Sequence, residues 1–274
     1  MKYYLPIFFF LALSACGGGG DSDSKSETNR IICEPAKTKF ASPTAQGAGI
    51  YRGFLENGFD DGVLGESSES STTAEGIGLL SPSGRIAFVA GNGVVTGFFT
   101  LLSPSALDGT STLDGNIKLW NSPTESDNLD LDGYLTAERD VMGYCMTCNY
   151  SSLGGPFYQF DAQYQVPKAD ICLASVDATG SWSQVDNGET TTLTIDGDND
   201  FTGSDSSGCV YSGSLRDGNI EGGIMEINTT ISNCDKAGQY IGVGSILGPS
   251  KEEVKNIIGA IWSDSRVIPI ALDK

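Results

Sequence analysis

Short apolar runs alternate with turn residues along most of the chain. Residues 190–195 place β-branched or apolar side chains at alternate positions, and residues 196–200 then form a turn before residues 201–203. Residues 77–89 repeat this order of strand, turn and strand, with Ser81-Pro82-Ser83-Gly84 as the turn. A two-residue period bounded by turns is typical of antiparallel hairpins. The pattern therefore predicts an all-β protein.

The landmarks around these two hairpins recur in the same order, which indicates an internal duplication. An aromatic opening strand precedes each hairpin, a glycine-bounded segment follows it, and the tetrapeptide Asp-Gly-Asn-Ile occurs twice at slightly different offsets. The paired segments are residues 49–53 with 180–183, residues 92–97 with 207–213, and residues 114–117 with 217–220. We expect two tandem, related antiparallel β-barrel or β-sandwich units, over residues 48–167 and 168–274.

One segment near the C-terminus carries the pattern of a helix. Ser250 and Glu253 form a capping box, and apolar side chains follow at helical spacing. These apolar residues are Val254, Ile257, Ile258 and Ile261. The sequence predicts one short C-terminal helix over residues 250–262, packed across a barrel mouth or a sheet, with a last strand over residues 266–272.

The first fifteen residues differ in kind from the rest. Lys2 precedes an apolar run over residues 5–13, and small residues follow it, as in a signal peptide. The run is about nine residues long, whereas a membrane-spanning helix needs roughly 20. Leu13-Ser14-Ala15-Cys16 resembles the lipobox of bacterial lipoproteins. That resemblance implies removal of residues 1–15 and acylation of Cys16, which would anchor the protein to a membrane.

The resemblance to lipoproteins also implies a location. In that class an aspartate directly after the cysteine retains the protein in the inner membrane, and here that position is Gly17, which favours the outer membrane. Residues 16–30 are then the lipidated cysteine and a flexible tether, because residues 17–29 carry no apolar side chain. The glycine-bounded segment 208–213 and the later Ser-Asn-Cys at 232–234 resemble uncharacterised β-rich outer-membrane lipoproteins of Gram-negative bacteria, a resemblance that implies no particular activity.

Six cysteines accompany Cys16 in the chain, and an exported protein meets an oxidising compartment, so we expect three disulfides. The first expected pair is Cys209 with Cys234, because both lie in strand-like segments of one unit. The Cys-x-x-Cys spacing of Cys145 and Cys148 also occurs in redox and zinc sites. A local disulfide is favoured, since no second pair at ligand spacing is present. The remaining pair would then be Cys33 with Cys172.

The charge and the absence of histidine exclude several functions. Sixteen basic residues against 35 acidic ones give a formal net charge of −19, which opposes binding to nucleic acid or to anionic lipid surfaces. Basic partners or divalent cations would be attracted, although solubility alone also explains the charge. No histidine is present, so Ser-His-Asp and Cys-His mechanisms and most catalytic zinc sites are excluded.

Two sets of residues are candidates for binding. Asp196, Asp198 and Asp200 alternate as at the start of a calcium-binding loop, but Phe201 stands where such a loop needs glycine, so a simple turn is favoured over a metal site. The second set is aromatic and would line a barrel pocket for an apolar ligand. It consists of Trp120, Tyr134, Tyr158, Phe160 and Tyr164. Core packing explains these side chains as well, because the last three share one face of a strand.

The function expected from the sequence is that of a non-enzymatic, membrane-anchored lipoprotein of the cell envelope that acts as a binding or structural module without a cofactor. Its partner would be an envelope protein or a small apolar ligand. The alternative is a carrier of lipid or of a small hydrophobic ligand, with a β-barrel pocket. A carboxylate-dependent hydrolase ranks third, since many carboxylates are present but no pair stands out.

Overall fold

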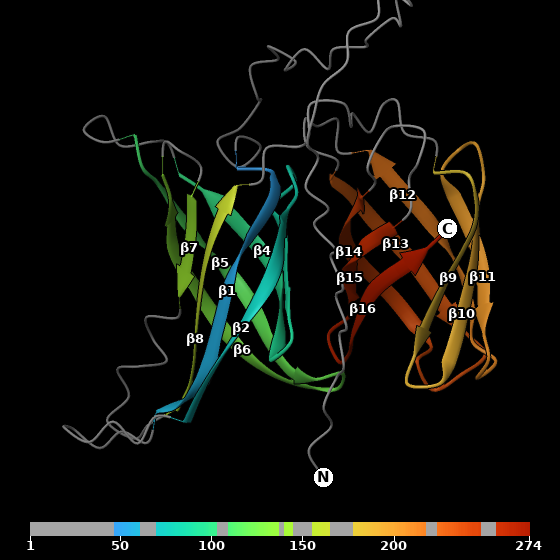
Figure 1. The fold of residues 1–274 in the computed structure, drawn as a ribbon, viewed down its shortest axis with the longest axis horizontal. Helices are drawn as coiled ribbons and strands as arrows, with labels where there is room; N and C mark the ends of the chain where they lie inside the picture. The colour runs from blue at the N-terminus through green and yellow to red at the C-terminus, as the bar shows by residue number, and fades with distance from the viewer. Residues whose placement is uncertain are drawn as a thin grey trace, which may run out of the picture.

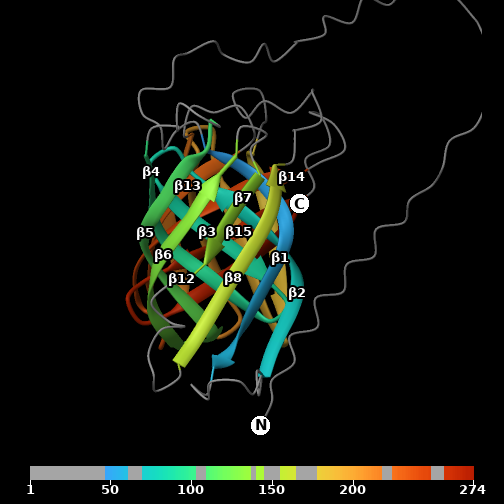
Figure 2. The same cartoon turned by 90° about the vertical axis from the view of Figure 1, so that its left-hand side faces the viewer.

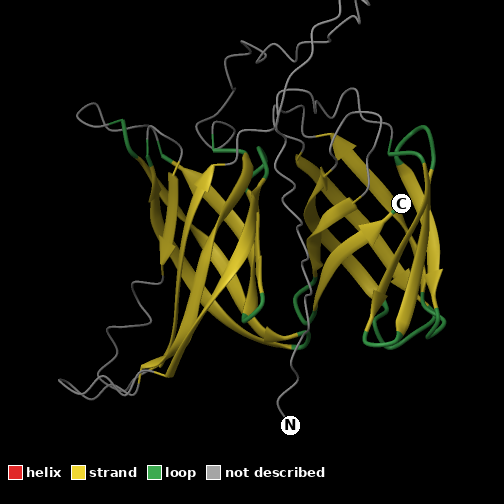
Figure 3. Ribbon diagram, viewed as in Figure 1, coloured by secondary structure: helices red, strands yellow, loops and turns green. Residues whose placement is uncertain are grey.

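The computed structural model describes residues 47–60, 70–102, 109–136, 140–144, 155–164, 178–217, 224–247 and 256–274. Two closed antiparallel β-barrels of eight strands each follow one another along the chain and lie side by side (Figure 1). Figure 3 shows strands and loops throughout this part of the chain, with no helix. The predicted all-β class with two tandem barrels is therefore confirmed. The proposed signal peptide, Cys16 and the tether lie outside the described residues.

The first barrel is closed by a long pairing between its first and last strands. Its strands are β1 (Gly49–Asp60), β2 (Ser70–Leu80), β3 (Arg85–Ala90), β4 (Gly93–Leu101), β5 (Ser111–Ser122), β6 (Glu125–Leu135), β7 (Asp140–Tyr144) and β8 (Gly155–Tyr164). Each strand pairs with the next, and β8 returns to β1 through ten residue pairs, from Tyr51 with Tyr164 to Asp60 with Gly155. Figure 2 shows β8 lying beside β1 at this closure.

The second barrel is closed by a much shorter seam. Its strands are β9 (Gly180–Asp186), β10 (Glu189–Ile195), β11 (Asp200–Asp205), β12 (Val210–Asp217), β13 (Ile224–Ser232), β14 (Gly238–Leu247), β15 (Asn256–Trp262) and β16 (Val267–Asp273). Between β9 and β16 a single pair is formed, Ser183 with Asp273. The amide of Gln184 bridges the strands beyond it, since it accepts a hydrogen bond from Ala271 N at 2.9 Å and donates one to Pro269 O at 3.4 Å.

Apolar side chains fill the interior of each barrel. Alternate residues of every strand point inward, as the two-residue period requires. In the first barrel Phe160 stacks on Phe88 and Tyr158, with ring centroids 5.5 and 6.2 Å apart. The core of the second barrel is formed around Trp182 and six buried isoleucines, Ile195, Ile227, Ile231, Ile246, Ile257 and Ile261. The buried face predicted for β8 is confirmed, because Tyr158, Phe160 and Ala162 are all buried in the first core.

The two barrels share local details that support a duplication. Tyr51 and Trp182 each follow the opening glycine by two residues, and each donates a hydrogen bond to the carbonyl four residues earlier, Gly47 O and Ala178 O. The β2–β3 and β10–β11 hairpins end in residues with positive φ, Gly84 and Asn199. The backbone carbonyl of Gly84 accepts a hydrogen bond from Phe99 N in β4, and that of Asn199 accepts one from Leu215 N in β12. Each donor lies in the fourth strand of its barrel. The same turn geometry is thus built twice from different residues.

One of the predicted correspondences is wrong. Residues 114–117 lie within β5, the fifth strand of the first barrel, whereas Asp217 ends β12, the fourth strand of the second. Strand register gives the true counterpart. Ile117 pairs with Gly97 and Thr229 pairs with Gly213, so Asn116 corresponds to Asn228. The repeated Asp-Gly-Asn-Ile tetrapeptide therefore does not mark equivalent positions in the two barrels.

The prediction of a C-terminal helix over residues 250–262 is also wrong for residues 256–262, the part of it that the structure describes. Residues 256–262 form β15, which pairs with β14 on one side and β16 on the other. Ile257 and Ile261 point into the second barrel, while Ala260 and Trp262 pack against the first. Because both faces of this strand are buried, its apolar residues do not alternate with polar ones and imitate a helical pattern. The last strand, β16, lies where it was predicted.

An apolar interface joins the two barrels. The outer faces of β2 to β5 contact those of β13 to β16, and the fully buried members of this cluster include Leu79, Ala87, Trp120, Val243 and Ala260. Arg85 reaches across the interface and donates hydrogen bonds to the backbone carbonyls of Ile227 and Gly242 at 3.0 and 3.1 Å. Burial of apolar surface and these charge-assisted bonds hold the barrels as one body.

Candidate functional site

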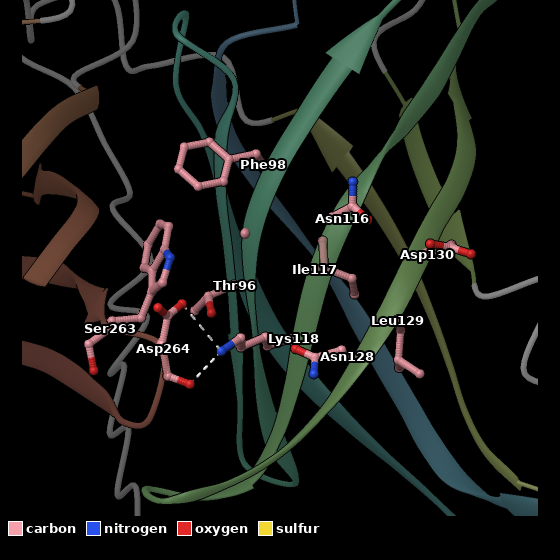
Figure 4. A pocket seen from close by; sticks show the side chains of 12 residues that line it. Thr96, Phe98, Asn116, Ile117, Lys118, Asn128, Leu129, Asp130, Ser263 and Asp264 are labelled. Carbon is pink, nitrogen blue, oxygen red and sulfur yellow. Dashed lines mark hydrogen bonds and ion pairs between the residues drawn. The ribbon is translucent and has the colours of Figure 1, made fainter.

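A groove of about 540 Å³ lies between the barrels (Figure 4). The outer face of β4, β5 and β6 forms one wall, and the turn that follows β15 forms the other, with Ser263 and Asp264. Trp262 also lines it but is only 5 % exposed, so the groove floor is continuous with the apolar interface. The groove is thus a concave surface in which a few polar side chains stand among apolar ones, and a packed interface supports it.

Strand register arranges the first wall as two rows of side chains that run across three strands. Phe98, Asn116 and Asp130 form one row, since Phe98 pairs with Asn116 and Asn116 with Asp130. Neighbouring strands lie about 4.8 Å apart, so Asn116 stands one strand spacing from each of the other two, and Phe98 and Asp130 stand two spacings apart. Figure 4 shows the row from left to right, with the ring of Phe98 on the side of the second barrel, then the amide of Asn116 and then the carboxylate of Asp130.

The second row consists of Thr96, Lys118 and Asn128. Lys118 is fixed in place, because its ammonium group donates a hydrogen bond to the backbone carbonyl of Asp264 and lies 3.7 Å from the carboxylate of the same residue. The ammonium also lies 5.5 Å from the centre of the Trp120 ring, a cation–π distance. Lys118 therefore connects the two walls of the groove and neutralises charge at its base.

The groove combines exposed and buried groups in a definite order. Phe98 is 50 % exposed, which is unusual for a phenylalanine in a barrel strand, and Asn116, Asn128 and Asp130 are exposed beside it. Beneath them Thr96 is fully buried and accepts a hydrogen bond from Trp120 Nε1 at 2.7 Å. A rigid base thus presents one aromatic ring, two amides and a carboxylate to solvent.

Four of the five aromatic residues predicted to line a pocket, Trp120, Tyr134, Tyr158 and Phe160, do not surround a common cavity. Tyr158 and Phe160 are buried in the first barrel core, whereas Trp120 is buried between the barrels. Tyr134 is partly exposed on the outer face, and Tyr164 ends β8. Burial, reinforced by Asp132 and Asp130 nearby, raises the pKa of the Tyr158 phenol. The groove residues were missed because only strand register shows that they are neighbours.

The three aspartates proposed as a weak calcium site make a turn instead. Asp196 Oδ1 accepts hydrogen bonds from the backbone NH groups of Asp198 and Asp200 at 2.9 and 3.0 Å, and Asp200 pairs with Arg216 at 3.2 Å. Within the described residues, the group of potential ligand atoms found close together is Cys209, Cys234 and Asp235, not these aspartates. The carboxylate of Asp196 therefore stabilises the hairpin turn between β10 and β11.

The structure joins Cys209 to Cys234 in a disulfide, the pair expected first from the sequence, with their Cα atoms 5.0 Å apart. Both sulfur atoms are used in this bond, so the neighbouring Asp235 does not make a metal site with them. The disulfide connects the start of β12 to the turn after β13. Cys33, Cys145, Cys148 and Cys172 lie outside the described residues.

A buried carboxylate stands next to this disulfide. Asp205 Oδ1 accepts hydrogen bonds from Ser207 N, Ser207 Oγ and Cys209 N, and Oδ2 accepts one from the Tyr211 hydroxyl at 2.7 Å and lies 3.4 Å from Lys236 Nζ. Burial alone would raise the pKa of Asp205, but these hydrogen bonds and the lysine outweigh burial and lower the pKa to about 2. Every oxygen is satisfied within the barrel, so this cluster is structural.

Comparison of the chain with protein-family models, curated proteins and solved structures gives no match. The described part of the chain contains no helix that could cross a bilayer. The function must therefore be argued from the geometry above.

Proposed function

We propose that this protein is a non-enzymatic, membrane-anchored module of the cell envelope that binds a partner in the groove between its two barrels. The observation that carries the proposal is the contrast between the two kinds of surface. The barrel interiors are filled by apolar side chains, whereas the groove presents exposed polar groups and one exposed ring on a rigid base. Sites of this kind, with a few well-placed polar groups, are typical of binding surfaces.

A carrier of lipid or of another apolar ligand has less support. Such a carrier needs an interior cavity, but in the first barrel Tyr51, Leu55, Phe88 and Phe160 each expose 1 % or less of their surface. In the second barrel Trp182 fills the corresponding place. Emptying either core would cost several kcal/mol for each large side chain displaced.

A hydrolase also has less support, although the groove has a carboxylate on each wall, Asp130 and Asp264. A glycosidase acid needs a carboxyl whose pKa is raised by an apolar surrounding. Both carboxylates are exposed to solvent, and that of Asp264 lies 3.7 Å from the ammonium of Lys118, so neither stands in an apolar surrounding. We therefore assign binding rather than catalysis to the groove.

The anchor is tested by fractionating cells that produce the full chain or its Cys16→Ser variant. The proposal expects the unchanged chain in the membrane fraction, with the mass of residues 16–274 plus acyl groups, because acyl chains hold a protein at a bilayer. The variant should leave that fraction. If both forms fractionate alike and carry no acyl mass, the anchor is disproved.

Binding in the groove is tested by site-specific photocrosslinking in living cells. Phe98 is replaced by p-benzoylphenylalanine, and the matched control places the same residue at Phe54, which is equally exposed at 52 % but lies on β1 outside the groove. We expect an adduct from position 98 and none from position 54. No adduct at position 98, or equal adducts at both positions, would refute the groove as the binding site of a protein partner.

A further inference from the structure

We infer that the groove binds an uncharged oligosaccharide, built of hexose or N-acetylhexosamine units. The inference rests on the proposed function, because it names the class of ligand for the same groove. A sugar ring has hydroxyl or acetamide groups around its edge and patches of C–H groups on its faces. A site for it must therefore supply hydrogen-bonding groups beside an accessible aromatic ring.

The first row of side chains meets both needs. The amide of Asn116 offers two donors and an acceptor, and the exposed carboxylate of Asp130 stands next to it on β6. Planar groups of this kind can bond two adjacent hydroxyls of one sugar. Because they stand on neighbouring strands at a spacing of about 4.8 Å, both can contact a single ring.

The ring of Phe98 supplies the apolar surface. It stands at the end of the same row as Asn116 and Asp130, and half of its surface is open to solvent. Contact with the C–H face of a sugar would bury this surface, which is otherwise costly to expose. Asn128, in the second row, adds another amide diagonally beside Asp130, so that the polar surface extends beyond one sugar unit.

The charge of the groove favours a neutral ligand. Lys118 is occupied by the backbone carbonyl and the carboxylate of Asp264, and it does not offer a free cation to an acidic sugar. Asp130 would repel a uronate or a phosphate, as would the net charge of −19 on the whole chain. An acidic glycan or a nucleic acid therefore fits this groove poorly.

Two other classes of ligand fit less well. A lipid chain would desolvate Asn116, Asn128 and Asp130 without replacing their hydrogen bonds with water, which is unfavourable. An extended peptide usually pairs with the free backbone edge of a sheet. The platform of β4, β5 and β6 offers only its face, since β5 pairs on both sides over these rows.

The test is isothermal titration calorimetry of the detergent-purified full chain with chitotetraose, cellotetraose and maltotetraose, and with tetragalacturonate as the acidic comparison. We expect at least one neutral tetrasaccharide to bind and tetragalacturonate to bind more weakly. Phe98→Ala and Asn116→Ala should each raise the dissociation constant about tenfold. The control Phe54→Ala should leave it unchanged, because that exposed ring lies outside the groove.

The inference is overturned if no neutral tetrasaccharide produces heat at about 10 mM, which is roughly ten times a weak dissociation constant of about 1 mM. It is also overturned if Phe54→Ala weakens binding as much as Phe98→Ala. A crosslinked protein at position 98 together with no saccharide binding would overturn the sugar assignment and leave the groove as a binding site. No adduct and no saccharide binding would overturn both. Recovery of cleaved tetrasaccharide would support the sugar class but contradict the non-enzymatic function.

Discussion

The substitution Asp205→Asn should destabilise the second barrel in a manner that depends on pH. Asp205 is buried, with a fully covered side chain, and its two oxygens accept hydrogen bonds from Ser207, Cys209 and Tyr211 beside the ammonium of Lys236. An asparagine keeps one acceptor oxygen. If its NH₂ group replaces Oδ2, however, it no longer accepts from the Tyr211 hydroxyl, and it faces the donor-only ammonium of Lys236.

The magnitude follows from the pKa of Asp205, which is lowered from 3.8 to about 2. A depressed pKa means that the folded state prefers the charged carboxylate. The resulting stabilisation is complete above the unfolded pKa and is lost as the pH falls toward the folded pKa. At 1.36 kcal/mol per pKa unit, the stabilisation is about 2 kcal/mol at pH 7, of which roughly half remains at pH 3.

The assay is calorimetric unfolding of the unchanged chain and of Asp205→Asn at pH 7 and at pH 3. Because the two barrels are expected to unfold together, a loss of about 2 kcal/mol lowers the melting temperature by roughly 6 °C. The matched control is Asp198→Asn in the exposed turn between β10 and β11, where a surface change should cost less than about 0.5 kcal/mol. The difference between the unchanged chain and Asp205→Asn should shrink by about 1 kcal/mol between pH 7 and pH 3.

Two results would contradict a stabilising role for the Asp205 carboxylate. If Asp205→Asn destabilises the barrel by the same amount at both pH values, its effect is one of packing and not of charge. If it does not lower the melting temperature at pH 7, the hydrogen bonds to Asp205 do not contribute the stability assigned to them.

Three further perturbations test other parts of the fold. Replacing Cys209 and Cys234 together by alanine should cost about 3.5 kcal/mol in the chain-entropy account of a disulfide at a sequence separation of 25, measured by urea unfolding without reductant; an unchanged midpoint would contradict this. Arg85→Gln removes the guanidinium hydrogen bonds to the second barrel. We expect the single calorimetric transition of the two barrels to split into two. A transition that stays single would show that the apolar contacts alone couple the barrels. Gly53→Ala would place a Cβ atom 1.8 Å from the carbonyl oxygen of Asp161. We expect thermal melting to show a loss of about 3 kcal/mol in the free energy of unfolding. An unchanged melting curve would show that β1 and β8 can move apart.

Strand alternation was enough to predict most of the architecture. The two hairpins at residues 77–89 and 190–203, the last strand and the Cys209–Cys234 pair could be inferred because each rests on local pattern or on cysteine chemistry. The helix over residues 250–262 failed for a physical reason. Ile257 faces the second core and Ala260 the first barrel, so burial on both faces removed the alternation by which a strand is recognised.

The groove could not be predicted from local pattern, because it depends on which residues of β4, β5 and β6 are paired. One signal was present in the sequence. Phe98 and Phe99 are adjacent within a strand, so they must point to opposite faces, and one of the two rings must lie outside the barrel. Phe99 is buried in the core and Phe98 is exposed. The neighbours Asn116 and Asp130 carry no comparable signal.

The single residue pair between β9 and β16 affects the order in which the second barrel folds and unfolds. The second barrel begins with β9 but is not closed until β16, the last strand in chain order, has been made. A chain emerging from the ribosome would therefore hold β9 and β10 as an open hairpin while about eighty further residues are added. A force applied at Lys274 would meet little backbone resistance from β9, so β16 should separate from β9 first, while its seven pairs with β15 and the ten-pair closure of the first barrel still hold.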